Sequence, residues 1–204
     1  MAENNQAKTL RTNEQKISPV LRLAILGMIS ALSVVLVLVN FPLPFAPPFL
    51  KMDFADTPML ICSVLFGPIA SLGVLFVVSV IQAFLLGGDS YLGCIMHIVA
   101  SGAMLAVTGL LTRRNKSTGR LILSLALGAL TMTALMIPMN YAITPLYLGG
   151  HTPENLAVIS DLMLPAIIPF NVVKSSVNCV IAFVLFKALQ VLFVKLGLVD
   201  APTK

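Results

Sequence analysis

The chain of 204 residues contains little charge: Asp, Glu, Lys and Arg make up 10% of it, whereas a soluble domain has about a quarter. It has no tryptophan, and 58% of its residues are hydrophobic. So few charges cannot cover the surface of a water-soluble domain of this size. The composition therefore predicts an integral membrane protein that forms one bundle rather than several domains.

Motifs of catalysis and of energy coupling are also absent from the sequence. It has no G-x-x-x-x-G-K-[ST] phosphate loop, no H-E-x-x-H, no G-x-S-x-G and no carboxylate cluster suited to a metal diphosphate. Cys62, Cys94 and Cys179 lie in apolar segments without metal-ligand spacing. We therefore expect no catalytic residue, metal or cofactor, and no ATP hydrolysis by this chain. The net charge of +5 comes without aromatic residues interleaved among the basic ones, so it does not indicate nucleic-acid binding.

Apolar runs near the roughly 20 residues that a bilayer requires predict an all-α fold of six transmembrane helices. The second run is short, and proline, glycine or polar loops separate the runs. The predicted spans are residues 20–41, 57–66, 69–86, 91–112, 121–141 and 165–192. We interpret residues 144–164 as a loop because they include Gly149, Gly150 and Pro153.

The distribution of charge predicts the orientation of the chain. If the N-terminus is cytoplasmic, eleven of the 13 Lys and Arg residues fall on the inner side, and five of the eight acids fall outside. This asymmetry obeys the positive-inside rule, so both termini are predicted to be cytoplasmic. The chain then divides into a cytosolic tail of residues 1–19, a membrane domain of residues 20–196 and a cytosolic tail of residues 197–204.

Lys174 is the most informative single residue because it lies inside the sixth predicted span. A cation there costs about 2.5–3.5 kcal/mol on insertion scales, so it is rare unless a cavity or a partner receives it. Asn171 and Asn178 lie three residues before and four residues after it, which places all three on one helix face. The polar face predicts a binding site. The alternative is a snorkelling lysine and two asparagines that hydrogen-bond neighbouring helices.

Polar residues of other spans fall in the same half of the membrane. Gln82, His97 and Asn140 lie in the outer halves of the third, fourth and fifth spans, whereas the inner halves contain almost no such groups. This distribution predicts a pocket open to the outside, because a channel would need polar residues along its whole length. His97 alone is more often a residue that hydrogen-bonds another helix. Asp53 and Asp56 flank a loop, so the sequence gives no intramembrane acid pair for a proton or sodium relay.

Five short motifs, spread over nearly the whole chain, are similar to those of a known protein family. They are F-L-K-M-D-F-A-D-T-P at 49–58, F-G-P at 66–68, M-N-Y at 139–141, T-P-L-Y at 144–147 and P-F-N-V-V-K at 169–174. With these motifs the chain resembles the substrate-binding S components of energy-coupling factor (ECF) vitamin transporters, and among them the riboflavin-specific members. The resemblance implies six helices with both termini inside, which agrees with the topology predicted from charge.

The resemblance implies a function and a set of binding residues. The ligand would be riboflavin, held by Asn140, Asn171 and Lys174, with the first outer loop covering it through Met52, Asp53 and Phe54. We add Asn178 and Gln82 as candidates because they belong to the same polar half. An asparagine amide offers a donor and an acceptor to the flavin edge, and lysine offers up to three donors. The alternatives are an S component for another vitamin or heterocycle, a stand-alone secondary transporter and a membrane enzyme.

Small residues on the first span predict a surface for a partner. Gly27 and Ala31, with Ala24 before them, let another helix approach closely, and packing within the bundle is the alternative. S components carry a similar motif on this helix, where it docks a shared transmembrane subunit. The resemblance therefore implies that this subunit and two cytosolic ATPases are partners, in a bacterial plasma membrane.

Overall fold

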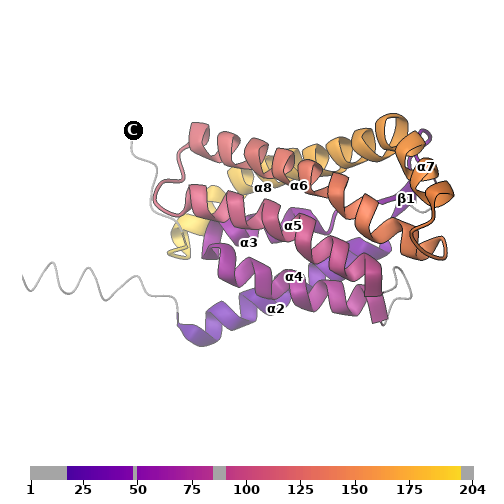
Figure 1. Ribbon diagram of the computed structural model, residues 1–204. Coiled ribbons are helices and arrows are strands. Elements are labelled where there is room, and N and C mark those ends of the chain that lie inside the picture. The colour runs from indigo at the N-terminus through magenta and orange to yellow at the C-terminus, as the bar shows by residue number, and fades with distance from the viewer. Residues whose placement is uncertain (1–17, 48–49, 85–90, 199–204) are drawn as a thin grey trace, which may run out of the picture.

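The computed structural model describes residues 18–47, 50–84 and 91–198, which form a helical bundle with one short strand pair (Figure 1). The strands β1 (Phe41–Pro42) and β2 (Lys51–Met52) are antiparallel, with Phe41 opposite Met52. The helices are α2 (Pro19–Leu38), α3 (Asp56–Phe66), α4 (Pro68–Phe84), α5 (Tyr91–Thr112), α6 (Thr118–Tyr147), α7 (Pro153–Leu162) and α8 (Ile168–Lys195), with a π-helix (Met163–Ile167) between the last two.

Four helices in the described part are long and apolar enough to cross a membrane. They are α2, α5, α6 and the continuous helical stretch Pro153–Lys195. The helices α3 and α4 are apolar but have only 11 and 17 residues. At about 1.5 Å per residue, α3 covers roughly half of a hydrocarbon core. The predicted all-α membrane fold is confirmed at this level, and the number of spans stays a prediction.

The predicted spans agree with α2, α3, α4 and α5 to within a few residues, but the loop predicted over residues 144–164 is wrong. There α6 continues to Tyr147, and after a turn at Gly149 and Gly150, both with positive φ, α7 begins. The hydroxyl of Thr152 accepts a hydrogen bond from the Asn155 amide at 3.2 Å, and Pro153 occupies the first turn. A capping threonine followed by proline is a typical start of a helix. In this segment it determines the structure, although Gly149 and Gly150 favour a loop.

The two ends of the bundle differ. In Figure 1 the start of α2 and the end of α8 lie at one end, and α7 lies with β1 at the other. The described residues include only small parts of the predicted tails, which are residues 1–19 and 197–204. The turn at 87–89, which closes the third predicted span, lies outside them. The division of the chain into tails and membrane domain therefore stays a prediction.

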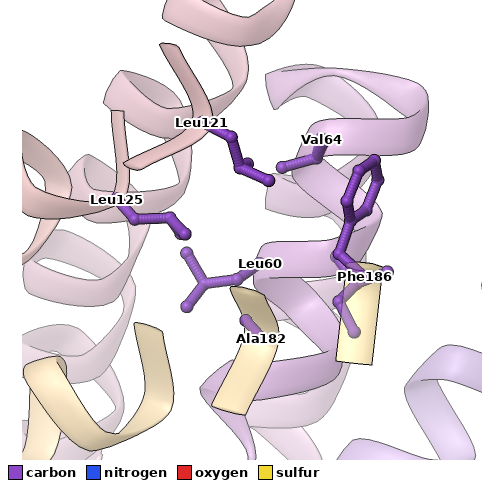
Figure 2. Close-up of a pocket in the computed structure, with 7 residues that line it drawn as sticks. Leu60, Val64, Leu121, Leu125, Ala182 and Phe186 are labelled. Atoms are coloured by element: carbon purple, nitrogen blue, oxygen red, sulfur yellow. The ribbon is translucent and has the colours of Figure 1, made fainter. Parts of the chain in front are cut away.

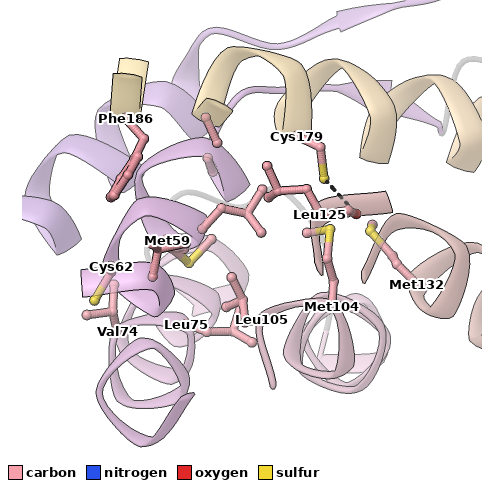
Figure 3. Packing of buried hydrophobic residues seen from close by; sticks show 14 of the residues in the cluster. Met59, Cys62, Val74, Leu75, Met104, Leu105, Leu125, Met132, Cys179 and Phe186 are labelled. Carbon is pink, nitrogen blue, oxygen red and sulfur yellow. Dashed lines mark hydrogen bonds between the residues drawn. The ribbon is translucent and has the colours of Figure 1, made fainter. Parts of the chain in front are cut away.

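The core of the bundle is apolar and tightly packed. Figure 2 shows a crevice between α3, α6 and α8 that is lined by apolar side chains and admits no water-sized molecule. Figure 3 shows the adjoining core, in which Cys62 and Cys179 are buried, whereas Cys94 is half-buried elsewhere. Gly109 lets α5 approach α3 and the start of α4 closely, because a Cβ there would clash with Ser63 and Pro68.

Candidate ligand-binding site

Lys174 of α8 forms an ion pair with Asp53, which directly follows β2. The distance from Lys174 Nζ to Asp53 Oδ2 is 2.6 Å, and the two side chains are 13% and 8% exposed. The other carboxylate oxygen of Asp53 accepts a hydrogen bond from the Ala55 amide at 3.1 Å. Lys174 therefore does not snorkel to the membrane surface. Its charge is balanced inside the protein by the segment that joins β2 to α3.

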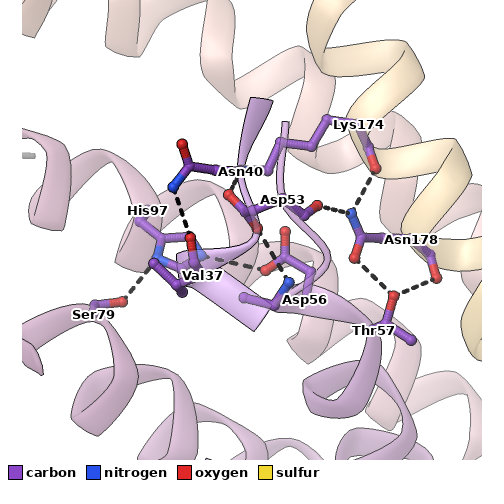
Figure 4. Close-up of polar contacts among 10 residues, drawn as sticks. Val37, Asn40, Asp53, Asp56, Thr57, Ser79, His97, Lys174 and Asn178 are labelled. Carbon is purple, nitrogen blue, oxygen red and sulfur yellow. Dashed lines mark hydrogen bonds and ion pairs between the residues drawn. The ribbon is translucent and has the colours of Figure 1, made fainter. Parts of the chain in front are cut away.

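Asn178, one turn further along α8, fastens the same segment to the helix (Figure 4). Its Nδ2 donates to the backbone oxygens of Asp53 and Lys174, at 3.0 Å each. The Thr57 hydroxyl donates to Asn178 Oδ1 at 2.8 Å. The structure thus brings Asp53, Lys174 and Asn178 together and adds Thr57, which sequence reasoning missed.

Asn140 and Asn171 are each 1% exposed and lie on α6 and α8, which pack against each other. Each side-chain amide nitrogen donates to the backbone oxygen four residues earlier, Asn140 to Met136 and Asn171 to Ile167. Thr144 donates to Asn140 Oδ1 at 2.9 Å. The Oδ1 of Asn171 is buried and accepts no hydrogen bond from the described residues. A buried acceptor without a donor is costly, so Asn171 is suited to receive a donor from a ligand.

A second cluster of polar side chains, formed by Asp56, His97 and Ser79, lies beside the cluster of Asp53, Lys174 and Asn178 (Figure 4). Asp56 is fully buried, and its Oδ1 lies 3.3 Å from Nε2 of His97 on α5. The Nδ1 of His97 lies 3.0 Å from the Ser79 hydroxyl on α4. Asp56 flanks the loop as expected, since it is the first residue of α3, but its side chain is buried and points into the bundle (Figure 4). Asp53 and Asp56 are thus both buried, which was not expected for two acids beside a loop.

The remaining predicted contacts have different surroundings. Met52 is buried on β2, and Phe54 packs its ring against Phe41 of β1 at a centroid distance of 6.1 Å. Gln82 lines a crevice between α4 and α5 together with His97 and Cys94, and this crevice admits no water-sized molecule.

Ala24, Gly27 and Ala31 lie on an exposed face of α2. A Cβ added to Gly27 would meet no atom within 4 Å. Within the described part of the chain, Gly27 therefore makes no close helix contact, and the alternative that these residues pack the bundle interior does not hold.

The chain is a bundle of apolar helices that encloses polar side chains, among them Lys174 and Asn171, at one end. This arrangement defines the class of membrane-embedded binding proteins. The sequence profile described as "ECF transporter, substrate-specific component" matches residues 21–186, and the chain belongs to this family. The family resemblance inferred from the motifs is thereby confirmed.

Individual relatives agree with this assignment. The chain is 32% identical to the riboflavin transporter FmnP of Bacillus subtilis over 174 residues, which cover 83% of this chain and 92% of the relative. It is 32% identical to the riboflavin transporter RibU of Staphylococcus aureus over 173 residues, 82% of this chain and 89% of the relative. A solved S component of a bacterial ECF transporter superposes with a TM-score of 0.70 at 31% identity, over 84% of this chain and 96% of that one. The protein is a multi-pass protein of the bacterial plasma membrane.

Proposed function

We propose that this chain is the riboflavin-binding S component of an ECF importer, which captures the vitamin outside the cell. One observation carries the proposal: a largely enclosed lysine and buried asparagines lie at one end of the bundle, in a chain whose relatives are riboflavin transporters. Lysine and asparagine supply the donors and acceptors that the polar edge of a flavin requires.

In this proposal Asn140, Asn171 and Lys174 contact the flavin directly, and residues 52–54 cover it. The unpaired Oδ1 of Asn171 supports this role, because the flavin ring has one N–H between two carbonyl groups. Neither crevice described above admits even a water molecule. Because Asp53 pairs with the Lys174 amine in this structure, we propose that the segment from Met52 to Ala55 moves away from α8 as the ring system enters and then returns to cover it.

We also propose six spans with both termini in the cytoplasm. The positive-inside distribution supports this topology, and so does the placement of the start of α2 and the end of α8 at one end of the bundle. The cluster of Asp53, Lys174 and Asn178 at the opposite end then faces the outside of the cell. The exposed small-residue face of α2 docks the shared transmembrane subunit, and two cytosolic ATPases supply energy, because this sequence has no phosphate loop.

Reconstitution in liposomes tests whether this chain binds the vitamin and the other subunits supply the energy for uptake. The purified chain in liposomes is expected to bind riboflavin without hydrolysing ATP and without accumulating the vitamin. Uptake is expected only after the transmembrane subunit and the ATPases are added, as measured with radiolabelled riboflavin. Other heterocyclic vitamins serve as competitors, and displacement by one of them at lower concentration would reassign the ligand. Concentrative uptake by the isolated chain, driven by a proton or sodium gradient, would show a secondary transporter instead.

A further inference from the structure

The Asp56–His97–Ser79 group makes none of the proposed flavin contacts, yet it is joined to the segment that does. Asp56 begins α3 three residues after Asp53, and Thr57 follows it. Successive helix residues point about 100° apart, so these neighbours reach different helices. Thr57 donates to Asn178 on α8, and Asp56 meets His97 on α5. The first turn of α3 is therefore held from two sides (Figure 4).

The chemistry of the carboxylate fixes the direction of these hydrogen bonds. An ionised Asp56 only accepts, so the Nε2–H of His97 donates to it. In a neutral ring the Nδ1 then accepts from the Ser79 hydroxyl. A chain of two hydrogen bonds thus runs from α4 through α5 to the start of α3. Because Asp56 is fully buried, loss of the histidine leaves a carboxylate without its principal donor, which favours displacement of this turn.

We propose that His97 and Asp56 are positioning residues for the flavin: they anchor the first turn of α3 so that residues 52–55 stay against α8 while ligand is bound. This inference rests on the proposed function, in which the flavin lies beside Lys174. The two residues act through the segment that carries Asp53 and need not touch the ligand. Their loss should therefore shorten the time for which the ligand stays bound, and should affect encounter with the ligand less.

The test compares purified variants by riboflavin titration and by stopped-flow dissociation. His97→Leu removes both hydrogen bonds at similar size, and it is expected to raise the Kd about tenfold, mainly through faster dissociation. His97→Gln keeps a donor and is expected to stay within about threefold of wild type. Asp56→Asn is a second variant of similar shape, with a Kd expected to rise about threefold or more. The matched control is Ser63→Ala, because Ser63 also joins α3 to α5, through the Leu105 oxygen at 2.6 Å, but two turns further along α3. Its Kd is expected to be unchanged.

A double variant distinguishes positioning from a general loss of stability. In Asp53→Ala the segment has lost its ion pair with Lys174 and keeps its hydrogen bonds to Asn178, so adding His97→Leu is expected to raise the Kd further by clearly less than tenfold, about threefold. A full tenfold additional loss would overturn the inference, because His97 would then act independently of the segment. A folded His97→Leu protein with wild-type Kd and dissociation rate would overturn it as well. Failure of the wild-type protein to bind riboflavin would instead contradict the proposed function, and the inference with it.

Discussion

Replacement of Lys174 by alanine is expected to weaken riboflavin binding by at least about tenfold, because hydrogen bonds from charged donors contribute about 1.5–3 kcal/mol. The substitution also removes the cation that balances the buried carboxylate of Asp53. The measurement is a fluorescence-quenching titration of the flavin with the purified variant.

Two further variants separate the causes of this loss. Lys187→Ala is the matched control, since Lys187 lies on the same helix near its C-terminal end and bonds Gln190 at 3.2 Å. Its affinity for riboflavin is expected to equal that of the wild type. In Lys174→Ala with Asp53→Ala no unbalanced carboxylate remains, so any affinity regained measures that penalty and the residual loss measures the direct contact. Wild-type affinity in Lys174→Ala would contradict the assignment of Lys174 to the site.

The second large effect concerns uptake rather than binding. Gly27→Leu, or Ala31→Leu, is expected to abolish co-purification with the transmembrane subunit and riboflavin uptake, while the Kd stays within about twofold. A Cβ added at Gly27 meets no atom within 4 Å, and both Gly27 and Ala31 are exposed on α2, so neither position packs inside the bundle. The added side chain blocks only the close approach of a helix from outside.

Both quantities are to be measured on the same preparation, by ligand titration and by co-purification. Ala126→Leu is the matched control, because Ala126 is exposed on α6, across the bundle from α2 in Figure 1. It is expected to preserve binding, co-purification and uptake. Normal complex formation by Gly27→Leu would move the docking surface elsewhere on the protein.

The sequence identifies the charged centre of the site but not its partners. Lys174 is conspicuous because a cation within an apolar span needs an explanation, and Asn171 and Asn178 follow from helical spacing alone. The pairing of Lys174 with Asp53 joins residues 121 positions apart, so only the packing of the segment after β2 against α8 creates it. No periodicity in the chain encodes that contact.

The burial of Asp56 was unpredictable for a related reason. An acid at the start of a helix, beside a loop, is usually exposed and favoured there by the helix dipole. Here α5 places His97 over it, and that depends on how α3, α4 and α5 pack. The loop predicted over residues 144–164 is wrong for a different reason. Thr152 and Pro153 are a local helix-start signal, but the two glycines before them favoured a loop. Local signals were thus present for the helix, whereas the contacts of the site arise from tertiary packing.

The absorbance spectrum of the purified protein tests riboflavin binding, the central claim, most directly. Protein purified from cells that contain riboflavin, or incubated with it and freed of excess by gel filtration, is expected to be yellow and to carry equimolar flavin. Lys174→Ala prepared in parallel is expected to carry much less. A folded, monodisperse wild-type protein that remains colourless after this incubation would contradict the account.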